Sequence, residues 1–277
     1  MFWQTAHHLI DLSVPRVMGI VNVTPDSFSD GGSYSDPAAA RAHCERLLAE
    51  GADLLDIGGE STRPGARAPS VQEELDRVMP VLEHAVALGM PVSIDTSEPE
   101  VMRAALAAGV DAINDVRALQ RPGALDAVRD HPNCGVCLMH MQGEPGSMQS
   151  APAYADVVAE VLSFLRQRLR AIEAAGVQSV RVTLDPGIGF GKTAAHNWAL
   201  MQRQAELHVL GRPLLVGWSR KSVLGTLTGR PVGQRGAASV AAALCAVERG
   251  AGIVRVHDVA ATVDALKVWR ASRGHGC

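Results

Sequence analysis

Eight short apolar runs recur along the chain, and each ends in a polar residue just before a loop marked by glycine or proline. A segment of helical character follows each run. The polar residues that end the runs are Asn22, Glu60, Asp95, Asn114, His140, Asp185, Ser219 and His257. Consecutive strand–loop–helix units of this kind are typical of a closed (β/α)8 barrel, in which the C-terminal ends of the strands meet at one mouth. The runs therefore predict an α/β protein, a single TIM barrel with its active site at the C-terminal mouth.

The spacing of apolar residues places the individual elements. Strands are expected at 14–23, 54–59, 91–96, 111–116, 135–140, 180–185, 213–219 and 252–259, and helices at 38–50, 71–88, 99–108 and 155–175. Repeated βα units give right-handed crossovers and a parallel sheet. An open doubly wound sheet is the competing architecture, but eight units favour closure. No low-complexity tract or long linker divides the chain, so residues 1–277 are interpreted as one domain.

The phase of the strands predicts which side chains face the barrel axis, because residues two apart share a face. The pairs that point together are Ser93 with Asp95, Ala112 with Asn114, Thr183 with Asp185, and Arg255 with His257. Their neighbours are bulky and apolar, which suits packing under the outer helices. A barrel axis needs no carboxylate for stability, since an unpaired buried charge is costly. Several carboxylates together at the barrel axis indicate a ligand that pairs with them.

Composition limits the class of partner. A formal net charge of −3 gives no reason to expect nucleic acid or an anionic membrane. Five cysteines, an odd number, argue against a disulfide framework, and Met1–Ser13 lacks the apolar core of a signal peptide. A cytoplasmic location is therefore expected. Of the 26 basic residues only three are lysines, namely Lys192, Lys221 and Lys267, so a lysine in a mouth loop stands out.

Two regions near the predicted mouth suggest anion binding. Ser219-Arg220-Lys221-Ser222 opens a helix after the seventh strand, and Arg255 and His257 close the eighth. In barrels the loops after these two strands commonly bind phosphate. A second interpretation is structural: Lys221 and Arg255 would then neutralise Asp95 and Asp185 in an ion network. The glycine-rich stretch 185–193 is not a nucleotide-binding P-loop, because Pro186 occupies the position of its first glycine.

Several motifs closely resemble those of the dihydropteroate synthase family. Residues 18–32 (MGIVNVTPDSFSDGG) resemble the first signature of that family, and residues 56–65 (DIGGESTRPG) resemble the second. The segments 113–115, 139–141, 184–192, 219–222 and 255–259 follow in the family's order, so the resemblance covers nearly the whole chain. It implies a bacterial-type transferase that condenses 6-hydroxymethyl-7,8-dihydropterin diphosphate with p-aminobenzoate, giving 7,8-dihydropteroate and diphosphate in folate biosynthesis.

The resemblance also implies roles for particular residues. Those expected to act in catalysis are Lys221, Arg255, His257 and Asp95. The pterin ring would be bound by Asp95, Asn114, Asp185, Lys221, Met139, Phe190 and Arg255, and the diphosphate by Asn22, Arg255 and His257, with Mg2+ bridging from Asn22. The p-aminobenzoate side would comprise Thr62, Arg63, Pro64, Ser222 and Phe190, with Phe28 and Pro25 of the first loop folding over it. A homodimer is expected as well.

Two tryptophans depart from the usual family pattern. Trp218 precedes Ser219 where a small or aliphatic residue is common, and Trp198 stands where leucine is common. Trp218 either narrows the mouth near Lys221 or points outward without affecting function, and the outward, neutral placement is favoured.

The expected reaction is a dissociative substitution. Diphosphate leaves first, the methylene cation is delocalised into the pterin, and the neutral aniline nitrogen then attacks. Two other functions share the fold. A methyltetrahydrofolate methyltransferase has no use for a diphosphate pocket, so Arg255, His257 and 219–222 argue against it. A non-catalytic pterin-binding paralogue should have lost residues such as Asn22, Thr62 and Arg63, all of which are present.

Overall fold

The computed structural model describes residues 1–24, 37–61 and 67–274. Within them eight parallel strands form a closed barrel, in the order β10-β3-β4-β5-β6-β7-β8-β9 with β9 and β10 paired. These strands are β3 (Arg16–Asn22), β4 (Leu54–Gly58), β5 (Val92–Asp95), β6 (Ala112–Asp115), β7 (Gly135–Met139), β8 (Val182–Asp185), β9 (Leu214–Val216) and β10 (Ala251–Val256). The predicted barrel is confirmed, and the open sheet is excluded because β10 pairs directly with β3.

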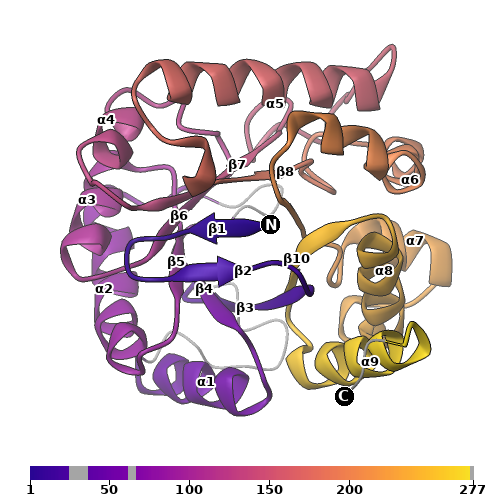
Figure 1. Ribbon diagram of the computed structural model, residues 1–277, viewed down its shortest axis with the longest axis horizontal. Coiled ribbons are helices and arrows are strands. Elements are labelled where there is room, and N and C mark those ends of the chain that lie inside the picture. Colours follow the sequence, from indigo (N-terminus) through magenta and orange to yellow (C-terminus); the bar gives the residue numbers. More distant parts are fainter. Residues whose placement is uncertain (25–36, 62–66, 275–277) are drawn as a thin grey trace.

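Helices surround the barrel (Figure 1). Within the described residues they are α1 (Pro37–Ala49), α2 (Val71–Ala87), α3 (Pro99–Ala107), α4 (Ala124–Arg129), α5 (Val157–Ala174), α6 (Ala194–Gln202), α7 (Ser222–Thr228), α8 (Gly236–Glu248) and α9 (Val259–Ser272), with 3-10 turns η2 (Ser179–Arg181), η3 (Gln204–Leu210) and η4 (Val232–Gln234). Local sequence explains several helix ends. Ser70 and Glu73 form a capping box at the start of α2, and Asp156 caps α5. None of the described helices is long and apolar enough to cross a membrane.

The strand phase inferred from the sequence is confirmed by burial. The apolar neighbours of the polar positions, including Val92, Ile94, Ile113, Leu184 and Val254, belong to the large core between the barrel and its helices. A smaller core lies inside the barrel and contains Met18, Leu54, Ala112, Leu215 and Ile253, from early positions of five strands. The polar residues at later positions of these strands are therefore left to line the opposite end, which is the mouth.

A short hairpin covers the end of the barrel at which the strands begin. It consists of β1 (Phe2–Gln4) and β2 (Leu9–Asp11), and it lies across the middle of the ring of helices in Figure 1. Trp3 is fully buried in the inner core, and its indole N–H donates to the carbonyl of Arg181 at 2.9 Å. The hairpin is a finding that the sequence patterns do not indicate, because each strand has only three residues.

The predicted element boundaries differ from the observed ones mainly at strand ends. The seventh barrel strand was expected at 213–219, whereas β9 ends at Val216 because Gly217, Trp218 and Ser219 leave the ladder to begin the loop that carries Lys221. Residues 180–181 belong to η2 and not to β8. Val180 and Trp218 extend the apolar character past the two strands, whereas the backbone pairing begins at Val182 in β8 and ends at Val216 in β9.

Candidate active site

An arginine joins two carboxylates at the centre of the mouth. Arg255 on β10 donates from Nε to Oδ2 of Asp56 at 2.5 Å and from Nη2 to Oδ2 of Asp95 at 2.8 Å. Burial would lower the pKa of Arg255, but the two carboxylates outweigh it and raise that pKa above its ordinary value. Burial also raises the pKa of Asp95, although Arg255 opposes that effect. The structural ion network considered from the sequence therefore exists for Arg255 and Asp95.

Asp56 on β4 was not among the predicted site residues. Its side chain is fully buried, and Oδ2 accepts the Nδ2 hydrogen of Asn114 at 3.0 Å besides that of Arg255. Its other oxygen, Oδ1, has no hydrogen-bond partner among the described residues. The amide of Asn114 is oriented by this contact, which leaves its carbonyl oxygen as the acceptor that it offers elsewhere. The sequence does contain a signal that could have identified Asp56: it is a carboxylate in the middle of the otherwise apolar strand 54–58, on the same face as Gly58.

Asp185 lies at the end of β8 and is 6% exposed. Its Oδ1 accepts the backbone N–H of Gly187 at 2.7 Å. Burial raises the pKa of Asp185 to about 6, and this contact, Lys221 and Arg255 limit the shift. The carboxyl group is thus placed to gain or lose its proton close to neutral pH.

Lys221 reaches the mouth through a strained turn. Arg220 has a φ of 57°, and its Nη2 donates to Oδ1 of Asp258 at 2.7 Å. The next residue, Lys221, places Nζ 4.2 Å from the centroid of the Phe190 ring. Burial lowers the pKa of Lys221 to about 8, and the nearby Arg255 acts in the same direction. An ammonium group over an aromatic face is a favourable cation–π pair.

His257 and Ser219 lie together at the ends of β10 and β9. The Ser219 oxygen accepts the backbone N–H of His257 at 3.1 Å and lies 3.0 Å from its Nδ1. When the Ser219 hydroxyl donates its own hydrogen to Nδ1, the neutral ring carries its proton on Nε2. Asn22 is the last residue of β3, Met139 ends β7 almost fully buried, and Ser222 is exposed at the start of α7.

The predicted p-aminobenzoate residues are only partly described. Ser222 and Phe190 lie at the mouth as stated, whereas Pro25, Phe28, Thr62, Arg63 and Pro64 lie outside the described residues.

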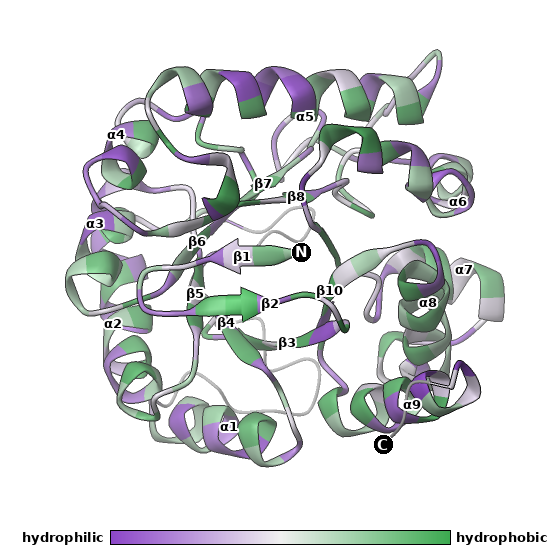
Figure 2. Ribbon diagram, in the orientation of Figure 1, coloured by the Kyte–Doolittle hydropathy of each residue, from purple (hydrophilic) through white to green (hydrophobic). Residues whose placement is uncertain are grey.

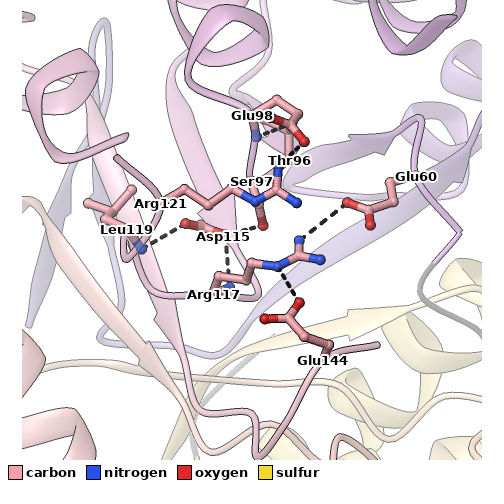
Figure 3. Close-up of polar contacts among 9 residues, drawn as sticks. All are labelled: Glu60, Thr96, Ser97, Glu98, Asp115, Arg117, Leu119, Arg121 and Glu144. Atoms are coloured by element: carbon pink, nitrogen blue, oxygen red, sulfur yellow. Dashed lines mark hydrogen bonds and ion pairs between the residues drawn. The ribbon is translucent and has the colours of Figure 1, made fainter. Parts of the chain in front are cut away.

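The rim of the mouth carries a second ionic network (Figure 3). Arg117, in the loop after β6, pairs with Glu60 at 3.5 Å and with Glu144 at 3.0 Å, so it joins the loops after β4, β6 and β7. Asp115 holds that loop by accepting the backbone N–H groups of Arg117 and Leu119. A cavity of about 330 Å³ lies beside this network, and none of the predicted ligand residues lines it.

Trp218 points outward from the barrel. Its side chain is 2% exposed and stacks on Trp198 of α6, with ring centroids 5.3 Å apart and planes inclined by 25°. Both rings belong to the packing between barrel and helices. Of the two placements considered from the sequence, the structure has the outward one, so the ring does not narrow the mouth.

The described residues contain no group of three or more His, Cys, Asp or Glu side chains that could hold a metal ion. The predicted Mg2+ ligand, Asn22, supplies a neutral amide oxygen, which is a hard donor of the kind Mg2+ accepts. A single protein donor suits an ion held mainly by phosphate oxygens and water. The donor set therefore fits an ion that arrives with a diphosphate.

Comparison with known proteins identifies relatives over nearly the whole chain. The model of a family described as pterin binding enzyme matches residues 18–257. A dihydropteroate synthase of Neisseria meningitidis serogroup C is 55% identical over 273 residues, covering 97% of this chain and 96% of the relative. The Xanthomonas albilineans dihydropteroate synthase with 4-aminobenzoic acid has a TM-score of 0.92 and 57% identity, covering 98% of both chains. The Burkholderia cenocepacia dihydropteroate synthase complexed with 7,8-dihydropteroate has a TM-score of 0.90 and 52% identity, and the match covers 99% of this chain and 96% of that chain.

Proposed function

The chain belongs to the dihydropteroate synthase family and is a transferase that forms 7,8-dihydropteroate; we propose that it does so by dissociative displacement of diphosphate at the barrel mouth. The substrates are the diphosphate ester of 6-hydroxymethyl-7,8-dihydropterin and p-aminobenzoate. One observation supports this proposal most strongly: hydrogen-bond acceptors and cations lie close together in the buried mouth. The acceptors are Asp95, Asp185 and Asn114, and the cations are Lys221 and Arg255.

The acceptors suit the pterin ring. Its amino group and adjacent ring N–H form a two-pronged donor that a carboxylate accepts, and Asp185 is a buried carboxyl group at the mouth that forms no arginine ion pair within the described residues. Asn114, oriented by Asp56, adds an amide oxygen as a further acceptor. Lys221 donates to the pterin carbonyl and ring nitrogen, while Met139 and Phe190 contact the ring faces. These contacts fix the ring and leave its methylene group toward the opening.

The cations suit the leaving group. Arg255 lies near the end of β10, His257 follows that strand and contacts Ser219 of the loop before α7, and Asn22 ends the neighbouring strand β3. His257 with its proton on Nε2 donates to a phosphate oxygen, and Arg255 is cationic at every physiological pH. Asn22 would hold Mg2+ together with the diphosphate oxygens, and the bound ion would supply neutralisation of negative charge on the leaving group. On the p-aminobenzoate side we assign Ser222 and Phe190, and from outside the described residues Thr62, Arg63, Pro64, Pro25 and Phe28.

The chemistry needs stabilisation of charge more than a strong base. The bond between the methylene carbon and the diphosphate oxygen breaks first, and its electron pair leaves with diphosphate. The aniline nitrogen then forms the new carbon–nitrogen bond and loses its proton to water. Preorganised cations at the leaving oxygen act in the transition state, and the buried mouth excludes water from the cation.

The first experiment is chromatographic detection of 7,8-dihydropteroate after mixing the protein with pterin diphosphate, p-aminobenzoate and Mg2+. We expect product from the wild type and none from Lys221→Ala or Arg255→Ala. Tight binding of pterin diphosphate without product would instead identify a non-catalytic paralogue. Diphosphate release strictly dependent on p-aminobenzoate, without a secondary isotope effect at the methylene carbon, would contradict the dissociative order.

We also propose that the protein acts as a homodimer in the cytoplasm. Helix α8 buries Ser239, Ala242 and Ala246 against the domain but leaves Ala237, Ala241 and Cys245, four residues apart, exposed. Figure 2 shows α8 as one of the most apolar helices on the outside of the barrel. Exposed apolar patches of this kind favour association. The free thiols of Cys44, Cys134 and Cys137 are compatible with a reducing compartment.

A further inference from the structure

Lys192 is a buried charge to which the proposed reaction assigns no role. The side chain belongs to the loop between β8 and α6 and is only 3% exposed. Burial lowers the pKa of Lys192 to about 7, with Asp185 opposing and Lys221 adding to that effect. An ammonium group in such a place is costly unless nearly all of its hydrogens are bonded.

All the partners of the Lys192 ammonium group are protein acceptors. Nζ lies 2.9 Å from Nδ1 of His140, 2.9 Å from the carbonyl oxygen of Gly187 and 3.0 Å from that of Phe190. The carbonyl oxygen of His140 is a fourth acceptor at 3.3 Å. His140 follows β7, whereas Gly187 and Phe190 belong to the loop after β8. The ammonium group therefore ties two neighbouring loops of the mouth together.

The loop that Lys192 holds has little stiffness of its own. Gly187, Gly189 and Gly191 all have positive φ, at 69°, 81° and 59°. Glycine loses more conformational freedom on folding than any other residue, so a loop with three of them needs strong contacts to stay in one conformation. A Cβ at Gly187 would overlap the carbonyl oxygen of His140, and one at Gly191 would overlap that of Gln142. The glycines permit the close approach of the loops, and Lys192 bonds them in that position.

Two residues assigned to the pterin lie in or next to this loop. Asp185 is the last residue of β8, directly before this loop, and its carboxylate accepts the N–H of Gly187 at 2.7 Å. Phe190 gives the carbonyl that Lys192 binds, and its ring lies under Nζ of Lys221 at 4.2 Å. A shift of the Gly187 or Phe190 backbone therefore moves the carboxylate and the ring together.

We propose that Lys192 is a positioning residue for the pterin site: its ammonium group fixes the β8–α6 loop against the end of β7 and so holds Asp185 and Phe190 in the arrangement that binds ligand. The inference rests on the proposed function, because it assumes that these two residues contact the pterin. It explains why lysine stands here in a chain that otherwise uses arginine for nearly all its cations. A compact ammonium group directs its donors to acceptors on several sides, whereas a planar guanidinium does not fit such a cage.

The test uses the full-length protein and calorimetric binding of 6-hydroxymethyl-7,8-dihydropterin. Lys192→Met keeps the length of the side chain and removes its donors. We expect the dissociation constant to rise roughly 10- to 100-fold at a temperature where the variant is fully folded, since small displacements in a site cost that much. Lys192→Arg should not restore binding. Lys267→Met, at an exposed lysine whose side chain is 69% accessible, is the matched control and should bind as the wild type does.

A double-mutant cycle separates positioning from general support of the fold. If Lys192 acts through Phe190 or through Asp185, Lys192→Met should weaken binding much less in a Phe190→Ala or in an Asp185→Asn background, respectively, than in the wild type. A loss in both of these backgrounds equal to that in the wild type, or unchanged binding by folded Lys192→Met, would overturn the inference. If Lys192→Met does not fold, Lys192→Gln, which keeps two donor hydrogens, takes its place in the same cycle. Wild-type protein that fails to bind the dihydropterin would overturn the proposed function, and with it this inference.

Discussion

Asp185 has a protonation state that should control ligand affinity. Its pKa is raised by burial to about 6, and only the ionised form accepts both pterin hydrogens. Affinity for a dihydropterin without diphosphate should therefore fall as the pH falls through this pKa, by roughly tenfold per unit below it. Calorimetry across this range checks the slope. Asp185→Asn should bind weakly at every pH, and its affinity should no longer depend on pH through this group. Equal wild-type affinity at about pH 5 and about pH 7 would remove Asp185 from the site.

Asp56 should be important for the stability of the barrel. It is fully buried and pairs with Arg255, which would keep only Asp95 if Asp56 were removed. Deleting one partner of a buried ion pair typically costs about 3–5 kcal/mol, because the other charge is left uncompensated. We expect Asp56→Ala to lower the urea midpoint accordingly. Asp264→Ala, at an exposed pair with Lys267, should leave it unchanged; equal midpoints for the two variants would refute the assignment.

At the level of elements, the N-terminal hairpin should support the fold without entering the chemistry. Trp3 fills the closed end of the barrel, opposite the mouth. Trp3→Ala should cost about 3–5 kcal/mol of unfolding free energy through the cavity it leaves, and the folded variant should keep its turnover. Phe2, its neighbour on the hairpin, is 50% exposed, so Phe2→Ala is the control and should be near neutral. Similar losses for both would show that the hairpin packs differently.

At the scale of the whole molecule, the exposed face of α8 should mediate dimerisation. A charge placed on it by Ala241→Glu would have to be buried between two copies, which is unfavourable. Sedimentation equilibrium should show a dimer for the wild type and a monomer for this variant. Ala159→Glu, on an exposed position of α5, should remain dimeric. A monomeric wild type, or a dimeric Ala241→Glu, would show that α8 is not the interface.

Apolar periodicity depends on local geometry, so the strands, their phase and the helices between them could be predicted to within a few residues. The motifs likewise placed Asp95, Asn114, Asp185 and Lys221 at one end of the barrel. The C-terminal ends of β9 and β10 were predicted less well, because pairing between the strands stops where the chain turns into the mouth loops, and residue type does not mark that point.

The barrel, its mouth and the chemical character of the groups there could be predicted, since they follow from the period and type of the residues. Which of these groups pair with one another depends on the folded chain. Asp56 and Arg255 are separated by 199 residues, and their contact depends on the register of a closed sheet, which no local pattern contains. The cage around Lys192 likewise needs two loops brought together by glycines whose left-handed backbone leaves room for it. Strand phase gives the face on which a side chain lies, but its partner is set by closure of the barrel.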